Sequence, residues 1–422
     1  MTTERTAKTL VGDAPAISIL VHDYSGHPFQ VQLSRALAQR GHRVIHSHCA
    51  AYVSGKGSLE SLPNEALRFA VVGRGKSISK YRFHRRLFQE VRYSLELCRL
   101  IAKERPDVVL MSNAPVPYLA VTAAYLAVRG TPWVLWHQDV HSAALQNVAS
   151  ARPTILLRLA AKTMEALERW SSRRAAHIVA ISSAFLSVHA RWGTADKVSV
   201  IPNWAPLDEL QPRDRSNTWA AQHALTGKKT LMYTGTLGLK HNPALLVSLA
   251  ASVKKQGESV VLVVVNEGVA AEVLHECADR EDIPLELLPF QAYTVLPDVL
   301  GAGDILVVLL EETASDFSVP SKTLSYLCAE RPIVGLMPES NPAAALIREA
   351  GGLVVPPNES QLDRAAAWLV EVLNDRDRAQ AIGRQGRALA ESRFALEPIA
   401  SAFEALLLAA MHTEPSLQMA HQ

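Results

Sequence analysis

Short apolar runs alternate with helical patterns along nearly the whole chain. The run AISILVH at 16–22 has the length of a buried strand, and FQVQLSRALAQRG at 29–41 follows it with apolar residues at helical spacing and a closing glycine. Apolar runs that alternate with helices are typical of a parallel sheet covered on both faces. The same pattern predicts further strands at 42–48, 107–112, 131–137, 176–182 and 198–203.

The strand–helix pattern then starts again after a stretch rich in proline and charge. That stretch, NWAPLDELQPRDRSNTWA at 203–220, is interpreted as an interdomain linker. A length of 422 residues also favours two domains. The predicted fold is therefore α/β, with two tandem doubly wound Rossmann-like domains at 16–205 and 206–396 and a cleft between them. The strands predicted for the second domain are 229–235, 259–265, 285–290, 304–310, 331–337 and 351–357.

Composition and charge narrow the class of protein. The chain is 48% hydrophobic and 20% charged, its longest apolar runs are strand-length, and its polar first residues lack the apolar core of a signal peptide. Four scattered cysteines show no metal spacing, so a protein of the reducing cytoplasm is expected. Residues 1–205 hold 26 Lys and Arg against 13 Asp and Glu, whereas the remainder holds 17 against 28. The basic first half should prefer an anionic partner.

Three predicted strands of the second domain end in loops suited to an anion. The first loop, YTGTLGLKHNP, carries Gly235 and Lys240, and the second places Asn266 and Glu267 at a strand end. The third, VPSK, presents an uncovered Lys322 at a helix start. Glycines allow close backbone approach, and free N–H groups at helix starts attract negative charge. The first loop alone is explained equally well as a plain turn, and a lone lysine like that of the third is more often solvated surface, but three such loops on one sheet indicate a phosphate-bearing ligand.

Polar residues also follow two strands of the first domain. HDYSGHPF places Gly26 and His27 before the first helix, and WHQDVHSAA places His137, Asp139 and His141 within five residues. Alternate positions past a strand end can point the same way, so an acid and an imidazole could share a site. A single histidine here is more simply a structural one. The spacing also permits a metal, but because no further ligand cluster supports it, no metal is expected.

A basic amphipathic helix is predicted within 73–107. Its apolar positions recur at helical spacing, with arginines along another face, among them Arg82, Arg85 and Arg92. Two readings stay open: a surface helix packed on its sheet, or an attachment surface for anionic lipid headgroups or a pyrophosphate lipid. In the first reading the packing residues are Leu87, Val91, Leu95, Cys98 and Ile101.

These motifs, in this order, resemble the retaining glycosyltransferases of the GT-B fold, in the large glycosyl transferase group 1 family. The likeness is greatest to bacterial enzymes of exopolysaccharide and O-antigen assembly, such as the colanic-acid type, and it covers about residues 16 to 410. It rests on GHPFQVQLSRALAQRGHRV, WHQDVHSAA, VIPNWAPL, YTGTLGLKHNPALL, LPFQAYTVLPDVLGAGDILVVLL and VPSKTLSYLCAERPIVG.

The resemblance implies that a nucleotide sugar binds mainly to the second domain and an acceptor to the first. The reacting sugar would lie beside His137, with Asp139 as a second catalytic candidate, and the acceptor would lie near Gly26, His27 and His141. The helix at 397–410 would cross back onto the first domain. No cofactor and no metal are expected. The donor-binding residues expected are Gly235, Thr236, Lys240, Asn266, Glu267, Pro289, Phe290, Val319, Pro320, Ser321, Lys322 and Ser325.

Two positions depart from the family pattern, because Phe317 and Ser325 stand where family members commonly carry glutamates. The expected function is transfer of a sugar from a nucleoside diphosphate sugar to a polyprenyl-pyrophosphate-linked glycan, with retained configuration, at the cytoplasmic face of the membrane. A catalytically weak or inactive scaffold of an assembly complex is one alternative. A nucleotide-sugar epimerase is another, although no convincing set of carboxylates supports it. A nucleic-acid partner is not expected, because the chain lacks an aromatic–basic recognition motif.

Overall fold

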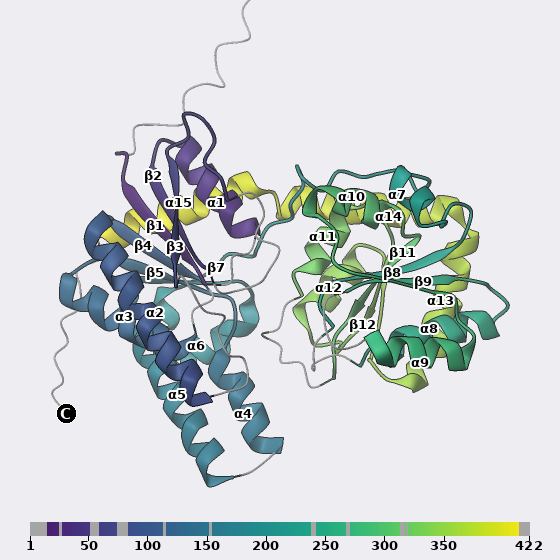
Figure 1. Ribbon diagram of the computed structural model, residues 1–422, viewed down its shortest axis with the longest axis horizontal. Helices are drawn as coiled ribbons and strands as arrows, with labels where there is room; N and C mark the ends of the chain where they lie inside the picture. The colour runs from purple at the N-terminus through teal and green to yellow at the C-terminus, as the bar shows by residue number, and fades with distance from the viewer. Residues whose placement is uncertain are drawn as a thin grey trace, which may run out of the picture. The chain divides into compact units, whose positions relative to one another are not determined.

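The structure of the protein is a computed structural model, and it contains two parallel sheets with helices between their strands (Figure 1). It describes residues 15–24, 28–50, 59–73, 83–112, 115–151, 154–237, 242–266, 271–312, 317 and 320–412.

The first sheet has seven strands in the order β3-β2-β1-β4-β5-β6-β7. Strand β1 lies between β2 and β4 and pairs in parallel with both, with Leu20 opposite Ile45 on one side and Val109 on the other. All six residues of β1 and all five of β4 are buried, as expected of strands covered on both faces. The strands are β1 (Ser18–Asp23), β2 (Arg43–Cys49), β3 (Leu67–Val72), β4 (Val108–Ser112), β5 (Trp133–His137), β6 (His177–Ala180) and β7 (Val198–Val200).

The second sheet has six strands in the order β10-β9-β8-β11-β12-β13. Alternate residues of β8 face opposite sides: Tyr233 joins the hydrophobic cluster under α8, α9 and α13, while Met232 joins the cluster under α7, α10, α11, α12 and α14. Both faces of this sheet are therefore covered. The strands are β8 (Thr230–Thr234), β9 (Val261–Val265), β10 (Leu285–Leu288), β11 (Ile305–Leu309), β12 (Ile333–Leu336) and β13 (Leu353–Val355).

The helices fill the connections between strands, as the alternating pattern predicts. They are α1 (Pro28–Gln39), α2 (Phe83–Glu104), α3 (Val116–Arg129), α4 (His141–Ala151), α5 (Ile155–Arg174), α6 (Leu186–Trp192), α7 (Thr218–Gln222), α8 (Ala244–Lys255), α9 (Ala271–Glu281), α10 (Leu296–Gly301), α11 (Lys322–Cys328), α12 (Pro342–Glu349), α13 (Leu362–Asn374), α14 (Arg376–Arg393) and α15 (Leu396–His412).

Each of the twelve apolar runs predicted as strands contains a strand, but strand β3 was not predicted from the sequence. This strand lies at the edge of the first sheet, pairs only with β2, and is buried only at Leu67 and Val72. Its apolar run, FAVV at 69–72, is as long as that of the central strand β4, so a signal was present, although the edge position leaves Arg68 exposed and the middle of the strand only partly buried.

The predicted packing face of α2 is partly wrong. Cys98 and Ile101 are buried as expected, but Val91 and Leu95 are exposed, and the buried face instead carries Tyr93, among other residues. Since 3.6 residues make one turn, apolar residues on two adjacent stripes both show helical spacing, and the pattern alone does not say which stripe faces inward. The structure gives α2 an outward stripe that is partly apolar.

The stretch predicted as a linker is packed rather than free. Leu210 and Trp219 belong to the core cluster beneath α11 and α14. The buried guanidinium of Arg387 on α14 donates to the carbonyl oxygens of Leu210 and Cys328 at 2.9 and 3.1 Å, and Ala205 donates its N–H to a carbonyl of the same region. The proline-rich and charged composition of this stretch correctly indicated that it forms no strand, but it did not indicate that the stretch packs against the core.

The chain divides into two compact units, one made of residues 1–136, 166–178 and 403–422 and the other of 137–165 and 179–402. Within the described chain, the stretch Arg376–His412, which comprises α14 and α15, is long and apolar enough to cross a membrane by length and composition alone. Its α15 half buries Ile399, Phe403 and Leu407, and packing covers 33% of its apolar 18-residue window.

Candidate functional site

Three strand-end loops of the second unit meet at one edge of its sheet, because β9, β8 and β11 are neighbours. Strand β8 ends at Thr234 and is followed by Gly235, whose φ of +126° is a conformation that favours glycine. The buried amide oxygen of Asn266, just past β9, accepts a hydrogen bond of 2.8 Å from the N–H of Leu237. Asn266 thus holds the loop that follows β8 in place.

Lys322, the first residue of α11, reaches this edge from the β11 side. Its Nζ lies 3.8 Å from the centre of the Tyr233 ring, a cation–π distance. A Cβ added at Gly235 would come within 3.0 Å of the same Nζ. Glycine at 235 therefore leaves the space that the ammonium group occupies.

The start of α11 is fixed to β8 by a tyrosine. The hydroxyl of Tyr326 accepts a hydrogen bond of 2.9 Å from the N–H of Thr234 and lies 3.3 Å from the carbonyl oxygen of the same residue. Tyr326 is fully buried. Because its ring lies one turn after Lys322, this contact sets the depth at which the lysine meets the strand end.

The amino group of Lys322 is buried, contrary to the uncovered charge expected from the sequence. Burial lowers the pKa of Lys322 to about 7. Neither its Nζ nor the neighbouring Thr323 Oγ1 has a hydrogen-bond partner among the residues that the structure describes. A buried ammonium with three donors and, within the described part of the chain, no hydrogen-bonding partner fits a negatively charged ligand, which would both supply acceptors and restore the charge.

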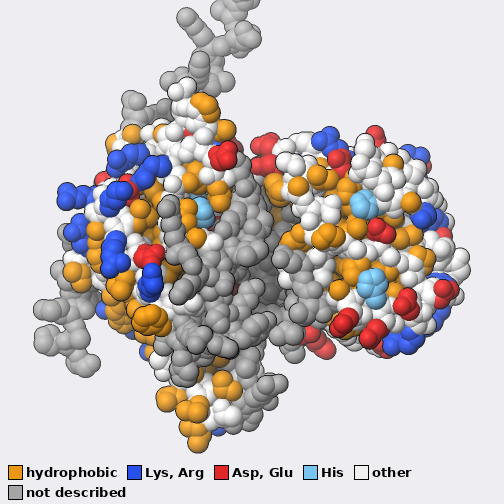
Figure 2. Space-filling view, in the orientation of Figure 1, with side chains coloured by type: hydrophobic (Ala, Val, Ile, Leu, Met, Phe, Trp, Pro, Cys, Tyr) orange, Lys and Arg blue, Asp and Glu red, His pale blue; other side chains and the backbone are white. Residues whose placement is uncertain are grey.

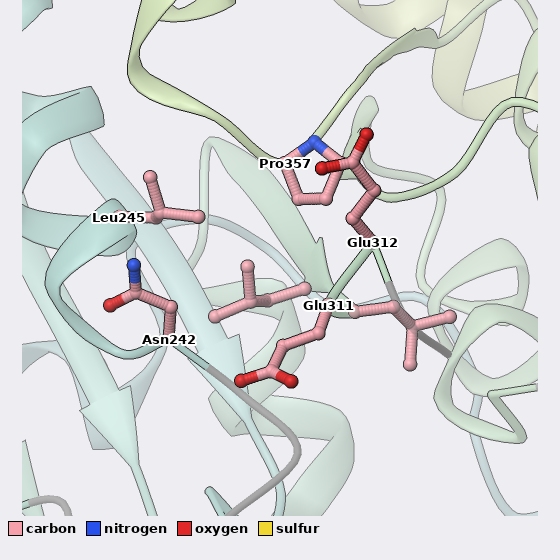
Figure 3. Close-up of a pocket in the computed structure, with 7 residues that line it drawn as sticks. Asn242, Leu245, Glu311, Glu312 and Pro357 are labelled. Atoms are coloured by element: carbon pink, nitrogen blue, oxygen red, sulfur yellow. The ribbon is translucent and has the colours of Figure 1, made fainter. Parts of the chain in front are cut away.

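A pocket of about 250 Å³ opens at the same strand-end edge, between the loops after β8, β11 and β13. Figure 3 shows Asn242 and Glu311 approaching it from different loops and the Glu312 carboxylate beside the Pro357 ring. The sequence interpretation missed Glu311 and Glu312, although both directly follow the predicted strand 304–310. Their position directly after a predicted strand was the sequence signal that could have identified them. Carboxylates there can accept hydrogen bonds from sugar hydroxyls.

The other predicted donor residues vary in burial. Thr236, Pro289, Phe290 and Ser321 are exposed, while Gly235, Pro320 and Ser325 are half-buried. Lys240, Glu267 and Val319 lie outside the described residues.

His137, at the end of β5, contacts another histidine rather than the predicted Asp139. Its Nδ1 lies 3.1 Å from Nε2 of His189, and Nδ1 of His189 lies 2.9 Å from Oγ1 of Thr194. Both imidazoles are buried and Asp139 is exposed. The rings of Phe185 and Trp192 flank His137, with centroids 5.4 and 6.0 Å away. The structure therefore places His137 in a side-chain relay with His189 and Thr194.

The direction of this relay can be assigned from its contacts. Thr194 Oγ1 also lies 3.4 Å from the carbonyl oxygen of His189 and can only donate to it. Thr194 then accepts from Nδ1–H of His189, whose Nε2 must accept from Nδ1–H of His137. In this assignment Nε2 of His137 is an acceptor, so a group that reaches it has to donate a hydrogen.

A second buried polar cluster, absent from the sequence prediction, lies at the end of β1. His22 Nδ1 is 2.7 Å from Ser47 Oγ, and its Nε2 is 3.1 Å from the Tyr93 hydroxyl. Burial, followed by repulsion from nearby imidazoles, lowers the pKa of His22 to about 3, and burial likewise lowers that of His46 to about 3. Both rings stay neutral at physiological pH.

The acceptor residues predicted for the first domain are only partly described. Gly26 and His27 lie outside the described residues, and His141 is half-buried as the first residue of α4. Within the described part of the chain, no group of three or more His, Cys, Asp or Glu side chains is placed to hold a metal. The absence of a metal stays a prediction.

Comparisons with known sequences point to one class of enzyme. The model of glycosyltransferase family 4 matches residues 29–209. The putative colanic acid biosynthesis glycosyl transferase WcaI of Escherichia coli K12 is 24% identical over 172 residues, which span 40% of this chain and 42% of that relative. The probable glycosyltransferase WbjE of Pseudomonas aeruginosa is 24% identical over 304 residues, 71% of this chain and 74% of the relative.

Solved structures show the same fold. Anabaena Alr3699/HepE in complex with UDP-glucose superposes with a TM-score of 0.70 at 17% identity, covering 93% of this chain and all of the other. Sucrose-phosphate synthase of Thermosynechococcus elongatus gives a TM-score of 0.67 at 14% identity, covering 92% and 98%. The resemblance to GT-B glycosyltransferases stated from the sequence motifs is confirmed, and so is the fold of two Rossmann-like sheets.

Proposed function

Starting from a chain with the GT-B fold and the sequence signature of glycosyltransferase family 4, we propose that it transfers a sugar from a nucleoside diphosphate sugar to a lipid-linked glycan, with retained configuration, in bacterial surface polysaccharide synthesis. The observation that carries the proposal is the buried Nζ of Lys322, which has no hydrogen-bond partner among the described residues and lies beside Gly235, at the edge where β8, β9 and β11 end. It is a site shaped for the diphosphate of a donor. The likeness to a fold solved with UDP-glucose makes UDP the first nucleotide to try.

In the proposed reaction the bond between C1 of the donor sugar and the diphosphate oxygen breaks. A bond forms between C1 and the acceptor oxygen on the same face, and the acceptor proton passes to the leaving phosphate. Negative charge grows on the diphosphate as the first bond breaks. The ammonium of Lys322, already placed in a water-poor site, stabilises that charge without reorganisation. No carboxylate nucleophile is needed, so Phe317 and Ser325 at the family's glutamate positions do not exclude the reaction.

Two further residues would hold the sugar. Glu311 and Asn242, which line the pocket at this edge, can bind donor hydroxyls. His137, the last residue of β5, would orient the acceptor hydroxyl. Neither role requires a metal or a cofactor.

The acceptor is proposed to be a polyprenyl-pyrophosphate-linked sugar at the cytoplasmic face of the membrane. Support comes from the basic first half of the chain and from α2, where Arg92, Arg99 and Lys103 are exposed. Figure 2 shows Lys and Arg side chains gathered over the region of α2. Of the arginines named from the sequence, Arg82 lies outside the described residues, and the side chain of Arg85 is not described.

Thermal unfolding with added UDP, GDP, dTDP and CMP tests the proposal, because a ligand that binds only the folded state raises the Tm. One diphosphate should stabilise the wild type and fail to stabilise Lys322→Ala. Lys254→Ala is a matched control, since Lys254 is an exposed lysine of the same unit that pairs with Asp282. A chain that responds to no nucleotide would instead be the inactive scaffold that Phe317 and Ser325 suggest.

A further inference from the structure

Helices α4 and α5 form a hairpin whose end carries exposed apolar side chains. Ile155, Leu156 and Leu159, in the first turns of α5, keep 84%, 79% and 62% of their surface exposed. Figure 2 shows hydrophobic side chains gathered where Figure 1 places the end of the α4–α5 hairpin. Large apolar side chains clustered on one exposed face mark an interaction surface more often than scattered ones do.

The exposure does not result from a loosely held helix. Thr154 Oγ1 accepts the N–H of Leu157 and so caps the start of α5. Further along, Glu165 accepts hydrogen bonds from Gln146 on α4 and from the indole N–H of Trp192, at 2.9 and 3.3 Å. The hairpin is therefore fixed at its base, and its apolar end is presented by an ordered helix.

Charge around these side chains has a single sign. Arg158 and Lys162 are exposed and share one helical stripe with Ile155 and Leu159, since the four positions are spaced by three or four residues. The sequence from Val140 to Met164 contains no aspartate or glutamate. Apolar side chains interleaved with cations and free of acids suit an anionic lipid surface, where apolar groups enter below the headgroups and cations reach the phosphates.

We propose that this end of α5, here called the α5 tip (Ile155, Leu156, Arg158, Leu159 and Lys162), inserts into the headgroup region of an anionic bilayer. The inference deepens the proposed function, on which its biological sense rests, since a lipid-linked acceptor is reached from a bilayer. It is a different surface from the one proposed on α2, because it lies on another helix, in the first turns of α5.

A second copy of the chain fits the α5 tip less well. A two-fold contact would bring Arg158 and Lys162 of both copies together with no carboxylate on the tip to pair with them. Three apolar side chains also form a patch well below the roughly 800 Å² per partner of a stable interface. A bilayer containing phosphatidylglycerol meets both requirements, since it provides an apolar layer and negative charge.

Flotation of the full-length protein with vesicles tests the proposal, using phosphatidylcholine alone and equal parts phosphatidylcholine and phosphatidylglycerol. The variant Ile155→Ser/Leu156→Ser/Leu159→Ser should partition into the anionic vesicles at least tenfold less than wild type. Arg158→Glu/Lys162→Glu should bind less to the vesicles that contain phosphatidylglycerol, while its binding to phosphatidylcholine vesicles should not change. Val128→Ser is the matched control, because Val128 is an apolar residue on α3 that is 88% exposed, and it should bind as wild type does.

A label reports insertion directly. The four native cysteines are buried, so a polarity-sensitive dye can be attached to Leu156→Cys or, as control, to Val128→Cys. Only the first should show a blue shift on anionic vesicles. The proposal is overturned if wild type does not float, if the serine variant floats equally well, or if that variant changes self-association in sedimentation without changing vesicle binding. UDP stabilisation of all variants, measured alongside, separates failure of this proposal from failure of the proposed function.

Discussion

Replacement of Lys322 by methionine should stabilise the empty protein while abolishing nucleotide binding. Methionine fills a similar volume over the Tyr233 ring and brings no charge into the buried site. The pKa of Lys322 is about 7 against an ordinary value of 10.5, a difference that corresponds to about 5 kcal/mol against the charged form. This is the upper bound on the free energy that the substitution can recover.

The sign of the pH dependence follows from proton binding. Between pH 7 and 10.5 the unfolded chain holds the Lys322 proton more fully than the folded chain, so wild-type stability from this group rises with pH across that window. Below pH 7 both states are protonated and the whole cost of burial is present. Urea unfolding should therefore show Lys322→Met to be more stable than wild type by up to about 5 kcal/mol at pH 6.5, with the difference shrinking towards pH 10.5.

Nucleotide binding should depend on pH in the opposite sense. A diphosphate binds the charged lysine, so complex formation takes up a proton, and the affinity for UDP should fall about tenfold per pH unit between pH 7.5 and 9.5. Isothermal titration calorimetry in buffers of different ionisation enthalpy measures the number of protons taken up when UDP binds. Lys254→Met, at an exposed ion pair, should keep the wild-type slope. An affinity independent of pH over this range, or nucleotide binding by Lys322→Met, would refute the assigned role.

Three other results are expected. Gly235→Ala should destabilise the protein by about 1–3 kcal/mol, because alanine is strained at this positive φ, and should also displace Lys322. UDP should therefore no longer raise the Tm of this variant. Gly257→Ala, at φ +88° with open space around it, should lower stability but keep the response to UDP. Burial holds the pKa of His22 and His46 near 3, so between pH 6.5 and 4.5 these histidines gain a proton in the unfolded chain only. Each should therefore lower the free energy of unfolding by about 2–3 kcal/mol over this range, and the unfolding free energy of His46→Leu should depend less on pH. Thr194→Val should release the tautomer of His189 and lower kcat more than KM, with the change visible in imidazole nitrogen shifts and with Thr194→Ser restoring it.

Elements in the middle of the sheets could be predicted from the sequence because they bury both faces. The runs that became β4, β9 and β11 are almost wholly apolar, which only a doubly covered strand requires. The sequences of edge strands and surface helices are less constrained, because only part of each element is buried. Strand β3 and the inward stripe of α2 were missed or misplaced for this reason, since partial burial leaves more than one pattern acceptable.

The candidate site was predictable by position but not by chemistry. The loops at Gly235, Asn266 and Lys322 were correctly expected to follow strands of one sheet, and the structure shows that these strands are neighbours. The burial of Lys322 Nζ was not, because it depends on the Tyr233 ring, which lies far away in the sequence. The His137–His189 contact spans 52 residues and carries no local signal either.

The energetics of Lys322 bear on whether the chain is an enzyme or a scaffold. Phe317 and Ser325 remove two carboxylates that the family commonly places near the donor, and by themselves they favour a site that has lost its ligand. A site without a ligand, however, gains nothing from a buried ammonium that costs up to about 5 kcal/mol, comparable to much of the stability of a domain. Nor does it need a glycine in a left-handed conformation to leave room for that group. The retained cost is explained if an anion repays it on binding, which favours a working donor site.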